Sequence, residues 1–383
     1  MELMRTIFPL VLSLFFAGTA CAVPVLVGIY QTSSFEEIKV EITSGAYQLK
    51  GASEPVAISS EQSVNVVVNG SGWIVKLGER RISGQGSLIF QGEGLFRIVP
   101  VGHKPTGRIF PGELIVRSQG NKLVMLNRLD IEEYVPGVIE AEAGPNHTPE
   151  YYKVQAIISR TYALNNLKRH ESEGFNICDQ VHCQVYHGKP RFVKEAVTAT
   201  KETFDIVIVD DDINLITAAF HSNCGGHTVN AEDVWSKPLS YCVGRRDTFC
   251  LVMPHSNWEK TIPAEQWRSY LESKRFPGED TLAIEATAYF PASKEVYFVH
   301  ERTHIPLRTI RSDFKLKSAF FTVHQDGSEV RLIGQGFGHG VGLCQEGAMR
   351  MAQLGYSYKE IIAYYYHGVH LIPRRFIWFF KED

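Results

Sequence analysis

The hydrophobic pattern of this chain changes from strand-like to helix-like along its length, and this change most limits the folds open to it. Residues 23–109 contain short β-branched runs, among them KVEI, VNVVV, GWIVKLG and SLIF, broken by glycine, serine and asparagine. Residues 149–168 instead carry apolar side chains at helical spacing, after Thr148 as a helix cap and Pro149 as a first helical residue. Strands that precede helices in this way predict an α+β fold.

The length of 383 residues leaves room for two domains. We expect a β-rich N-terminal domain over residues 23–110 and a mixed α+β domain over residues 111–383. In the second domain, two strands should meet at the turn Gln119-Gly120-Asn121. The other expected elements are a helix over 136–143 ended by Gly144, a buried strand over 215–222, and helices over 263–273, 345–354 and 358–368.

Residues 1–22 have the order of a secretory signal peptide. Arg5 is followed by an apolar run over residues 7–17 and by the small residues Ala20-Cys21-Ala22. The run is too short to cross a bilayer, and no later segment is long and apolar enough to do so. We therefore expect cleavage after Ala22 and export to the periplasm or cell envelope, outside the cytoplasmic membrane, with a lipid anchor at Cys21 as the alternative.

Charge and cysteine content narrow the partners and the chemistry. The 39 basic and 42 acidic residues are nearly balanced, so the sequence predicts no nucleic-acid partner. Removal of the signal peptide takes one of the seven cysteines away and leaves an even number, which permits disulfides in an exported protein. Cys242 and Cys250 flank a short polar loop and form the most natural local pair.

Two glutamates lie in the otherwise mostly apolar run YVPGVIEAEAG, residues 134–144. If residues 136–143 are helical, Glu142 shares a stripe with Val135, Val138 and Ile139, whereas Glu140 lies off it and can reach solvent. A carboxyl on the apolar face loses hydration, which raises its pKa and suits it to act as a general acid near neutral pH. The structural alternative is that Glu142 pairs with a buried Arg160.

Five sequence blocks together resemble the stage II sporulation protein D family (SpoIID/LytB), whose members are exported proteins that act on bacterial peptidoglycan. The blocks extend over about residues 112–370, with a divergent stretch at about 237–331. Ala143 stands where the family commonly has methionine, and Cys344 where serine is common. The blocks are LNRLDIEEYVPGVIEAEA, YYKVQAIISRTYAL, FNICDQVHCQVYHG, FHSNCGGHTVNAEDVW and GQGFGHGVGLCQEGAMRMAQLGYSYKEIIAYYYHG.

The resemblance implies a lytic transglycosylase with one catalytic glutamate, at the position of Glu142. A hydrolytic glycosidase generally needs two carboxylates, whereas this reaction can use one. The acid protonates the oxygen between N-acetylmuramic acid and N-acetylglucosamine and then deprotonates the sugar's own 6-hydroxyl, which closes a 1,6-anhydro ring. No cofactor is required for this chemistry. Gln155, Arg160 and Tyr162 could position the sugar or equally support the acid.

A cysteine and histidine block offers a metal site. His170, Cys178 and Cys183 lie close in sequence, with His182 and His187 nearby, and thiolates and imidazoles at such spacing suit Zn²⁺. Some members of this family resemble zinc proteins at this block, so the resemblance makes a metal plausible. A Cys178–Cys183 disulfide or two free thiols are the alternatives, and an oxidising location favours the disulfide. We expect any zinc here to be structural.

Two further blocks predict the lining of a sugar cleft. The segment FHSNCGGHT places Cys224 between His221 and His227, but histidine and thiol need not face each other as a catalytic dyad requires. A Gly-Gly turn that shapes the cleft is the better interpretation. The glycines of GFGHGVGLCQ let the backbone approach a ligand, and they do not match a nucleotide fingerprint. The expected substrate contacts in these blocks are Ser222, Asn223, His339 and Gln345.

Three classes of function follow from these observations. The first is a transglycosylase that acts on glycan strands, which the resemblance suggests are stripped of stem peptides. The second is a non-catalytic peptidoglycan-binding protein that enhances a separate cell-wall amidase. The third, a metallo- or cysteine hydrolase, is disfavoured because no HExxH-like signature occurs.

Overall fold

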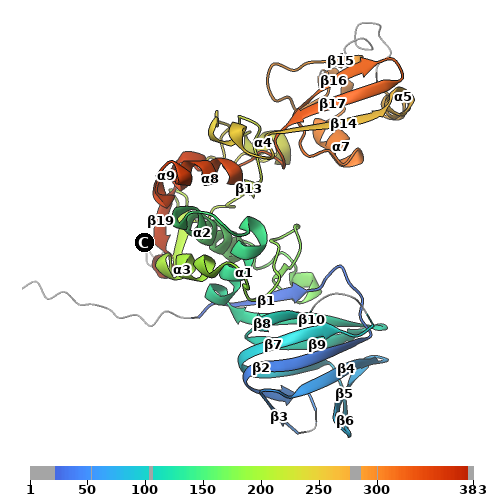
Figure 1. Ribbon diagram of the computed structural model, residues 1–383, viewed down its shortest axis with the longest axis vertical. Helices are drawn as coiled ribbons and strands as arrows, with labels where there is room; N and C mark the ends of the chain where they lie inside the picture. The colour runs from blue at the N-terminus through green and yellow to red at the C-terminus, as the bar shows by residue number, and fades with distance from the viewer. Residues whose placement is uncertain (1–21, 53, 103–106, 277–285, 300, 378–383) are drawn as a thin grey trace, which may run out of the picture.

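The computed structural model describes residues 22–52, 54–102, 107–276, 286–299 and 301–377. The predicted signal peptide lies outside these residues, apart from Ala22. Within them the chain forms a β-rich part, a central part built on helices, and a smaller lobe inserted late in the sequence (Figure 1). The α+β prediction with a β-rich N-terminal region is therefore confirmed.

The N-terminal part is one mainly antiparallel sheet of eleven strands. Nine strands follow the order β11-β1-β10-β9-β7-β2-β4-β5-β6, while β3 pairs with β2 and β8 with β7. The sheet continues past residue 110, where the sequence suggested a domain boundary, because β9 and β10 pair within it. The strands are β1 (Pro24–Ile29), β2 (Glu37–Lys50), β3 (Val56–Ser59), β4 (Ser63–Asn69), β5 (Gly72–Leu77), β6 (Arg80–Gln85), β7 (Ser87–Pro100), β8 (Arg108–Pro111), β9 (Glu113–Gln119), β10 (Lys122–Asp130) and β11 (Ile177–Cys178).

Helix α1 (Ile131–Ala143) follows β10 without a loop. Asp130 makes the junction rigid, because its carboxylate accepts hydrogen bonds from the Glu132 amide and the Val23 amide, both at 2.8 Å. The helix begins earlier than predicted and ends as expected at Gly144, whose φ is 70°. Its apolar stripe packs into the core that the helix shares with the sheet.

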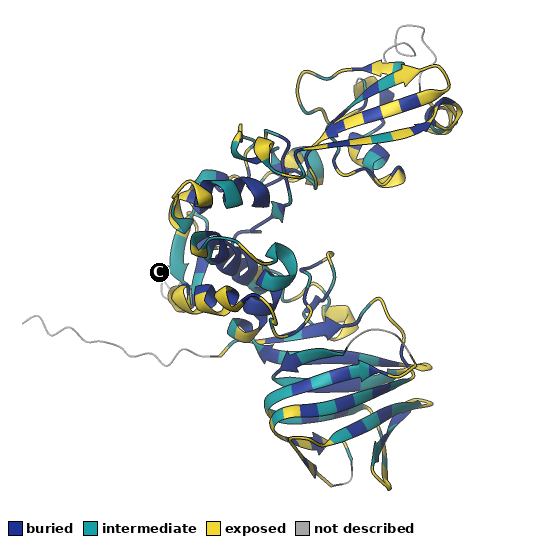
Figure 2. Cartoon of the chain, viewed as in Figure 1, coloured by how far each residue is buried: buried dark blue, intermediate teal, exposed yellow. Residues whose placement is uncertain are grey.

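The central part surrounds α2 (Pro149–Asn165), which begins at the predicted Thr148 cap. Most of α2 is buried (Figure 2). It packs on one side against the core of the sheet and on the other against a second core that includes the C-terminal helices. The remaining elements here are α3 (Lys194–Glu202), β12 (Ile206–Val209), β13 (Phe220–His221), α4 (Ala231–Trp235), η2 (Phe249–Val252), β18 (Leu343–Cys344), α8 (Gln345–Gln353), α9 (Tyr358–Tyr365) and β19 (His370–Pro373).

The strand predicted over residues 215–222 is mostly wrong. Only the two residues of β13 are in a strand, where they pair in parallel with β18. Ile216 and Ala218 are buried as expected, but Ala218 has a φ of 44°, which an extended strand does not allow. The Thr217 amide donates to the hydroxyl of Tyr241 at 3.1 Å, so a side chain replaces a neighbouring strand.

The divergent stretch forms a lobe with its own hydrophobic core. A four-stranded antiparallel sheet in the order β14-β17-β16-β15 packs against α5, the predicted helix, and α7. In Figure 1 this lobe lies at the end of the molecule opposite the N-terminal sheet. The elements are β14 (Asn257–Pro263), α5 (Ala264–Ser273), β15 (Ala288–Tyr289), α7 (Leu307–Asp313), β16 (Phe321–Asp326) and β17 (Glu329–Gln335).

Candidate functional site

A cleft of about 650 Å³ lies in the central part of the molecule. One side, here called the first wall, comes from α1, α2 and the loop after β11, and includes Glu142, Tyr162 and His182. The opposite side, the second wall, comes from β13, the glycine-rich loop before β18 and the start of α8. Among the described residues that line the cleft, Glu142 is the only carboxylate.

Glu142 has the environment that the helical stripe predicted. Val135, Val138 and Ile139 are fully buried, and Glu142 ends the same face of α1 at the cleft. Burial raises the pKa of its carboxyl, against the opposing effect of one hydrogen bond from a backbone amide. The Val185 amide donates that bond to Oε1 at 2.8 Å. The carboxyl is thus desolvated without a cationic partner among the described residues.

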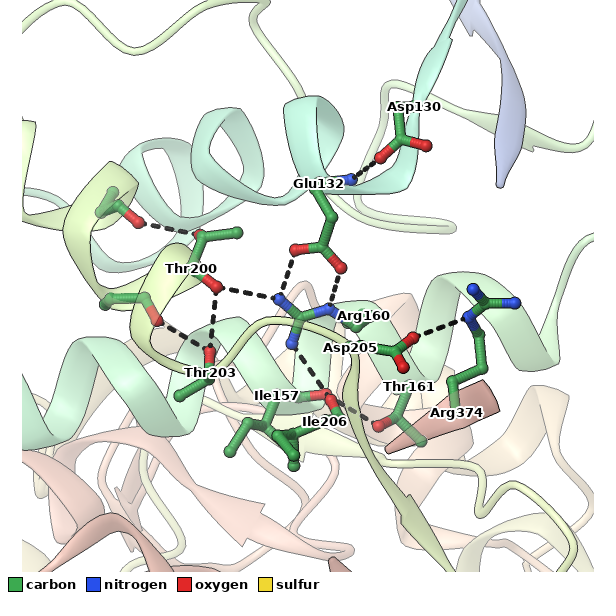
Figure 3. Close-up of polar contacts among 12 residues, drawn as sticks. Asp130, Glu132, Ile157, Arg160, Thr161, Thr200, Thr203, Asp205, Ile206 and Arg374 are labelled. Carbon is green, nitrogen blue, oxygen red and sulfur yellow. Dashed lines mark hydrogen bonds and ion pairs between the residues drawn. The ribbon is translucent and has the colours of Figure 1, made fainter. Parts of the chain in front are cut away.

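Arg160 does not pair with Glu142, so the structural alternative for the glutamate is wrong. Its buried guanidinium forms a two-pronged ion pair with Glu132, with N–O distances of 2.7 and 2.6 Å. It also donates to the carbonyls of Ile206 and Thr200, as Figure 3 shows. The arginine joins α1, α2 and the segment from α3 to β12, and it does not line the cleft.

Gln155 also lies away from the cleft. Its side chain is fully buried in α2 and donates to the hydroxyl of Tyr151 at 2.8 Å. Tyr162, by contrast, lines the first wall, where burial raises the pKa of its phenol to about 12. Arg169 donates to that hydroxyl at 3.2 Å and lines the cleft as well. Of the three expected α2 contacts, only Tyr162 can reach a bound sugar.

Glu140 lies off the apolar stripe and is partly exposed, as predicted, but its carboxylate is hydrogen-bonded within the protein. Its carboxylate accepts hydrogen bonds from three successive backbone amides, those of Arg191, Phe192 and Val193. These amides precede the first turn of α3, where a negative charge is favourable. Glu140 therefore fixes the start of α3 and takes no part in the cleft.

The loop that carries Val185 is held against α1 by close packing at Gly137. A Cβ atom at this position would lie 2.2 Å from the carbonyl oxygen of Gly188 and 2.7 Å from the ring of Tyr186. The ring of Tyr186 packs 4.9 Å from that of Tyr134, and its hydroxyl donates to Asn127 at 3.1 Å. These contacts fix the amide that bonds Glu142.

The second wall contains three of the four predicted contacts. Ser222, His339 and Gln345 line the cleft, whereas Asn223 is buried behind it. The Asn223 amide group donates to the Cys250 carbonyl at 3.0 Å and to Glu346 at 2.6 Å, so it supports the wall. Burial lowers the pKa of His339 to about 4, which keeps the ring neutral.

Two buried polar atoms of the second wall have no hydrogen-bond partner. They are Nε2 of His221 and Nε2 of Gln345. Nδ1 of His221 lies 3.1 Å from the Val341 carbonyl, which makes it the protonated nitrogen, so Nε2 is an acceptor. Burial lowers the pKa of this histidine strongly. A hydroxyl group of a ligand could donate a hydrogen bond to Nε2 of His221, and a carbonyl oxygen could accept one from Nε2 of Gln345.

Several lining residues were missed in the sequence. Trp235 is 41% exposed and Phe337 is 39% exposed, and both rings border the cleft, where flat apolar faces suit sugar rings. Arg311 comes from α7 in the inserted lobe. Trp235 and Phe337 lie in two of the resembled blocks but were not selected there, and Arg311 lies in the divergent stretch.

The predicted metal block is assembled in the structure, with one further histidine. The ligand atoms of His170, Cys178, His182 and Cys183 all lie within 4.8 Å of one another. We call these four residues the His/Cys cluster. The Glu173 carboxylate accepts from Nδ1 of His170, whose Nε2 lies 3.4 Å from Sγ of Cys183. A carboxylate behind a histidine is the usual support of a metal ligand.

The predicted pairing of Cys242 with Cys250 is wrong. All six described cysteines are free thiols. Burial raises the pKa of Cys242 to about 12, and Cys250 lies instead 3.4 Å from Cys224, measured between sulfur atoms. The turn through Gly225 and Gly226 brings Cys224 towards Cys250. The pattern of neighbouring residues does not predict this contact.

Comparison with known proteins gives a consistent result. Residues 119–209 match the family model described as Stage II sporulation protein. An uncharacterized protein of Brachyspira hyodysenteriae is 28% identical over 85% of this chain and 87% of its own length. Stage II sporulation protein D of Bacillus subtilis is 28% identical over 64% of this chain and 75% of its own length. Amidase enhancer of the same organism is 28% identical over 61% of this chain and 40% of its own length.

Proposed function

We propose, on the premise that this chain belongs to the stage II sporulation protein D family, that it is a lytic transglycosylase of peptidoglycan. A peptidoglycan-related function follows from the family and from the names of the relatives. The finer assignment rests on one observation: a single desolvated carboxyl, Glu142, borders the cleft, and the described lining holds no second one. A hydrolase would need a nucleophile or base in addition to the acid.

The proposed reaction cleaves the β-1,4 bond between N-acetylmuramic acid and N-acetylglucosamine. Glu142 begins protonated and gives its proton to the glycosidic oxygen as the bond to C1 breaks. The resulting carboxylate then takes the proton of the 6-hydroxyl on the same muramic acid residue, and O6 bonds to C1. The acid is restored, no water is consumed, and the product ends in a 1,6-anhydro ring.

The surroundings of Glu142 support both halves of this cycle. The Val185 amide bonds Oε1 and leaves Oε2 for the substrate. The same amide stabilises the carboxylate that forms after proton donation, which limits the cost of charge in a desolvated place. Tyr162 lies on the same wall and can donate a hydrogen bond, because its raised pKa keeps the phenol protonated.

The second wall supports the binding of acetylated sugars. The unpartnered Nε2 atom of Gln345 is a donor for an N-acetyl carbonyl, and that of His221 is an acceptor for a hydroxyl. Arg169 and Arg311 add positive charge to the cleft. The lactyl group of N-acetylmuramic acid carries a free carboxylate only where the stem peptide is absent, so these arginines favour peptide-stripped glycan as the substrate.

Product analysis tests this proposal directly. Purified protein should digest peptide-free glycan strands to fragments that end in 1,6-anhydro-N-acetylmuramic acid, each lighter by one water than a hydrolytic product. Intact, peptide-bearing peptidoglycan is the matched comparison and should be cleaved more slowly. Fragments with reducing ends would establish a hydrolase instead and refute the transglycosylase.

The alternative is a glycan-binding protein that enhances an amidase, and the aligned relative named Amidase enhancer favours it. In that case the wild type should bind peptide-free glycan without cleaving it. A cell-wall amidase assayed on whole peptidoglycan should then release stem peptides faster in its presence. The same cleft lining serves both functions, so the products of the digest decide between them.

We further propose that the His/Cys cluster holds a structural Zn²⁺. Two thiolates and two imidazoles would supply the four protein ligands that structural zinc prefers, and the carboxylate of Glu173 orients His170. The cluster lies just before the loop that bonds Glu142, so a metal here would stiffen the first wall. Metal analysis should find zinc that Cys178→Ser removes, whereas a Cys178–Cys183 disulfide in the intact mass would exclude it.

Export to the cell envelope is the remaining part of the proposal. Within the described residues, no helix has both the length and the apolar character needed to cross a bilayer. The predicted signal peptide supplies the route, and the mature protein should begin at Val23. N-terminal sequencing of protein from the cell envelope tests this, and an intact Met1 or a lipid on Cys21 would contradict it.

A further inference from the structure

A second group of metal-binding side chains lies behind the second wall of the cleft. Its ligand atoms all lie within 4.8 Å of one another, and each side chain is at most 1% exposed. Tetrahedral zinc with bonds of about 2.3 Å places its sulfur ligands about 3.8 Å apart, which is close to this spacing. We call this group the Cys/Asp cluster, and it consists of Cys224, Asp247, Cys250 and Cys344.

Backbone amides already surround the sulfur atoms of the cluster. The amides of Cys224 and Gly347 both donate to Sγ of Cys344 at 3.3 Å, and the Gly226 amide donates to Sγ of Cys250 at 3.3 Å. Cys344 also caps the N-terminus of α8, where the helix dipole favours negative charge. This pattern of donors suits thiolates, which are the form that binds a metal.

The carboxylate of Asp247 is oriented but lacks a cation. Its oxygens accept from the Tyr365 hydroxyl at 2.9 Å and from the Phe249 amide at 3.0 Å. No ion pair with lysine or arginine is formed by this fully buried carboxylate within the described residues. Buried charges are paired or coordinate metals, so a bound cation would supply the missing partner.

Close packing preserves the space around the cluster. A Cβ atom on Gly347 would lie 2.1 Å from the Tyr365 hydroxyl and 2.5 Å from an oxygen of Asp247.

The charge of the cluster is partly balanced by Lys294, from the inserted lobe, whose ammonium donates to the Cys224 carbonyl. Three thiolates and one carboxylate carry four negative charges, which a divalent ion and this lysine reduce to about one.

We propose that the Cys/Asp cluster binds one structural Zn²⁺ ion, a site distinct from the His/Cys cluster and independent of whether the cleft cleaves glycan. Binding would release the thiol protons to solvent. All four positions of a tetrahedral ion would be filled by protein, which is typical of structural rather than catalytic zinc.

The place of the cluster indicates what the ion stabilises. Cys224 lies two residues after Ser222, and Cys344 directly precedes Gln345. The ion would therefore connect two segments of the second wall. Cys250 lies shortly before β14, where the chain enters the inserted lobe, and the Gly336 amide returns to bond the Ser256 carbonyl at 2.9 Å. The ion would therefore also fix the base of that lobe.

The first experiment removes the His/Cys cluster and asks whether zinc remains. Full-length protein carrying Cys178→Ser and Cys183→Ser should be purified with reductant and without chelator, then analysed for metal. We expect about one zinc per chain in this double variant. Replacement of the zinc by Co²⁺ should give the intense near-ultraviolet charge-transfer band of cobalt bound to thiolates. No metal in the double variant, and no such band, would overturn the proposal.

Matched single variants then locate the site. Cys250→Ser in the same background should lose the remaining zinc, whereas Cys242→Ser should keep it. Cys242 is equally buried in the same core but lies outside the cluster, so it controls for the loss of a buried thiol. Equal zinc in both variants would contradict the assignment. A Cys224–Cys250 disulfide in the mass of the unreduced wild type would also overturn the proposal, because it would remove two of the thiolate ligands.

Discussion

The two walls of the cleft differ in how the chain builds them. The first wall comes from one stretch, residues 131–187, which contains α1, α2 and the loop after β11. The second wall joins segments that are 120 or more residues apart, such as His221 and Val341. The inserted lobe occupies most of the sequence between them.

The same contrast applies to the two clusters of potential metal ligands. The His/Cys cluster draws its ligands from residues 170–183, and one of its histidines, His182, is exposed. The Cys/Asp cluster draws on residues 224–344 and is completely buried. The residue proposed for the chemical step therefore lies on the first wall, which one stretch of sequence forms. The proposed sugar-binding residues lie on the second wall, which contacts between distant segments hold in place.

The largest expected effect is at the first wall. Glu142→Gln should lower the rate of glycan cleavage by about a hundred- to ten-thousand-fold, because the amide can neither donate nor accept the proton. Glycan binding and folding should be retained, since shape is preserved. Digestion with product quantification measures this.

Glu133→Gln is the matched control for that variant, because Glu133 is exposed on the same helix and does not line the cleft. Glu140 is unsuitable, since its carboxylate holds the start of α3. If Glu142→Gln cleaved glycan as fast as Glu133→Gln, the proposed acid would be wrong.

The next effect concerns stability rather than chemistry. Arg160→Met should lower the free energy of unfolding by about 3 kcal/mol, because Glu132 loses its partner and two carbonyls lose a donor. Denaturant unfolding measures the loss, and the folded fraction should cleave glycan at the normal rate. The double variant with Glu132→Gln should recover part of the stability. A raised KM with unchanged stability would instead restore Arg160 as a substrate contact.

A smaller effect is expected at Gly137, where only packing is at stake. Gly137→Ala should cost about 2 kcal/mol and displace the loop that carries Val185, since the new methyl group meets the Gly188 carbonyl. Cleavage should slow as the hydrogen bond to Glu142 weakens. Gly120→Ala is the comparison, because that turn glycine has no atom within 4 Å of an added Cβ. Its φ of 61° is strained for alanine, so stability alone should fall there, and a loss of activity in both variants would refute the loop argument.

At the second wall, Gln345→Leu should raise KM for peptide-free glycan by about tenfold with little change in kcat. One hydrogen bond to a substrate contributes about 1 to 1.5 kcal/mol, and Nε2 of Gln345 has no partner to lose within the protein. Steady-state kinetics separates the two constants. A fall in kcat with KM unchanged would place Gln345 in the chemical step instead.

The smallest expected effect is on the pH dependence of stability. Burial raises the pKa of Glu142 above its ordinary value of 4.5, so the folded protein binds this proton more tightly than the unfolded chain does. Its contribution is complete below about pH 4.5 and is lost as the pH rises through the folded pKa. Wild type should therefore lose stability relative to Glu142→Gln on going from about pH 4 to pH 8. A Tm difference independent of pH would contradict the shift.

Much of the first wall could be predicted from the sequence. The caps and spacing of α2 gave its start, and the stripe on α1 selected Glu142 over Glu140. Arg160 and Gln155 were misassigned because helical spacing shows which residues share a face but not which element covers that face. Arg160 takes its partners from α1, α3 and β12, whereas Gln155 is fully buried and bonds Tyr151 within α2.

By itself, the sequence determined the local features: the strands and turns of the first part, the helices with their caps, and the desolvated glutamate at the end of α1. These depend on side-chain periodicity and on residues within one turn of each other. Only the tertiary structure decided that Cys250 lies beside Cys224 and Cys344, that Arg160 pairs with Glu132, and that His221 faces the cleft with Nε2 unsatisfied. The physical reason is that these contacts join segments separated by a folded lobe or a whole helix, and their geometry is set by packing that no local pattern encodes.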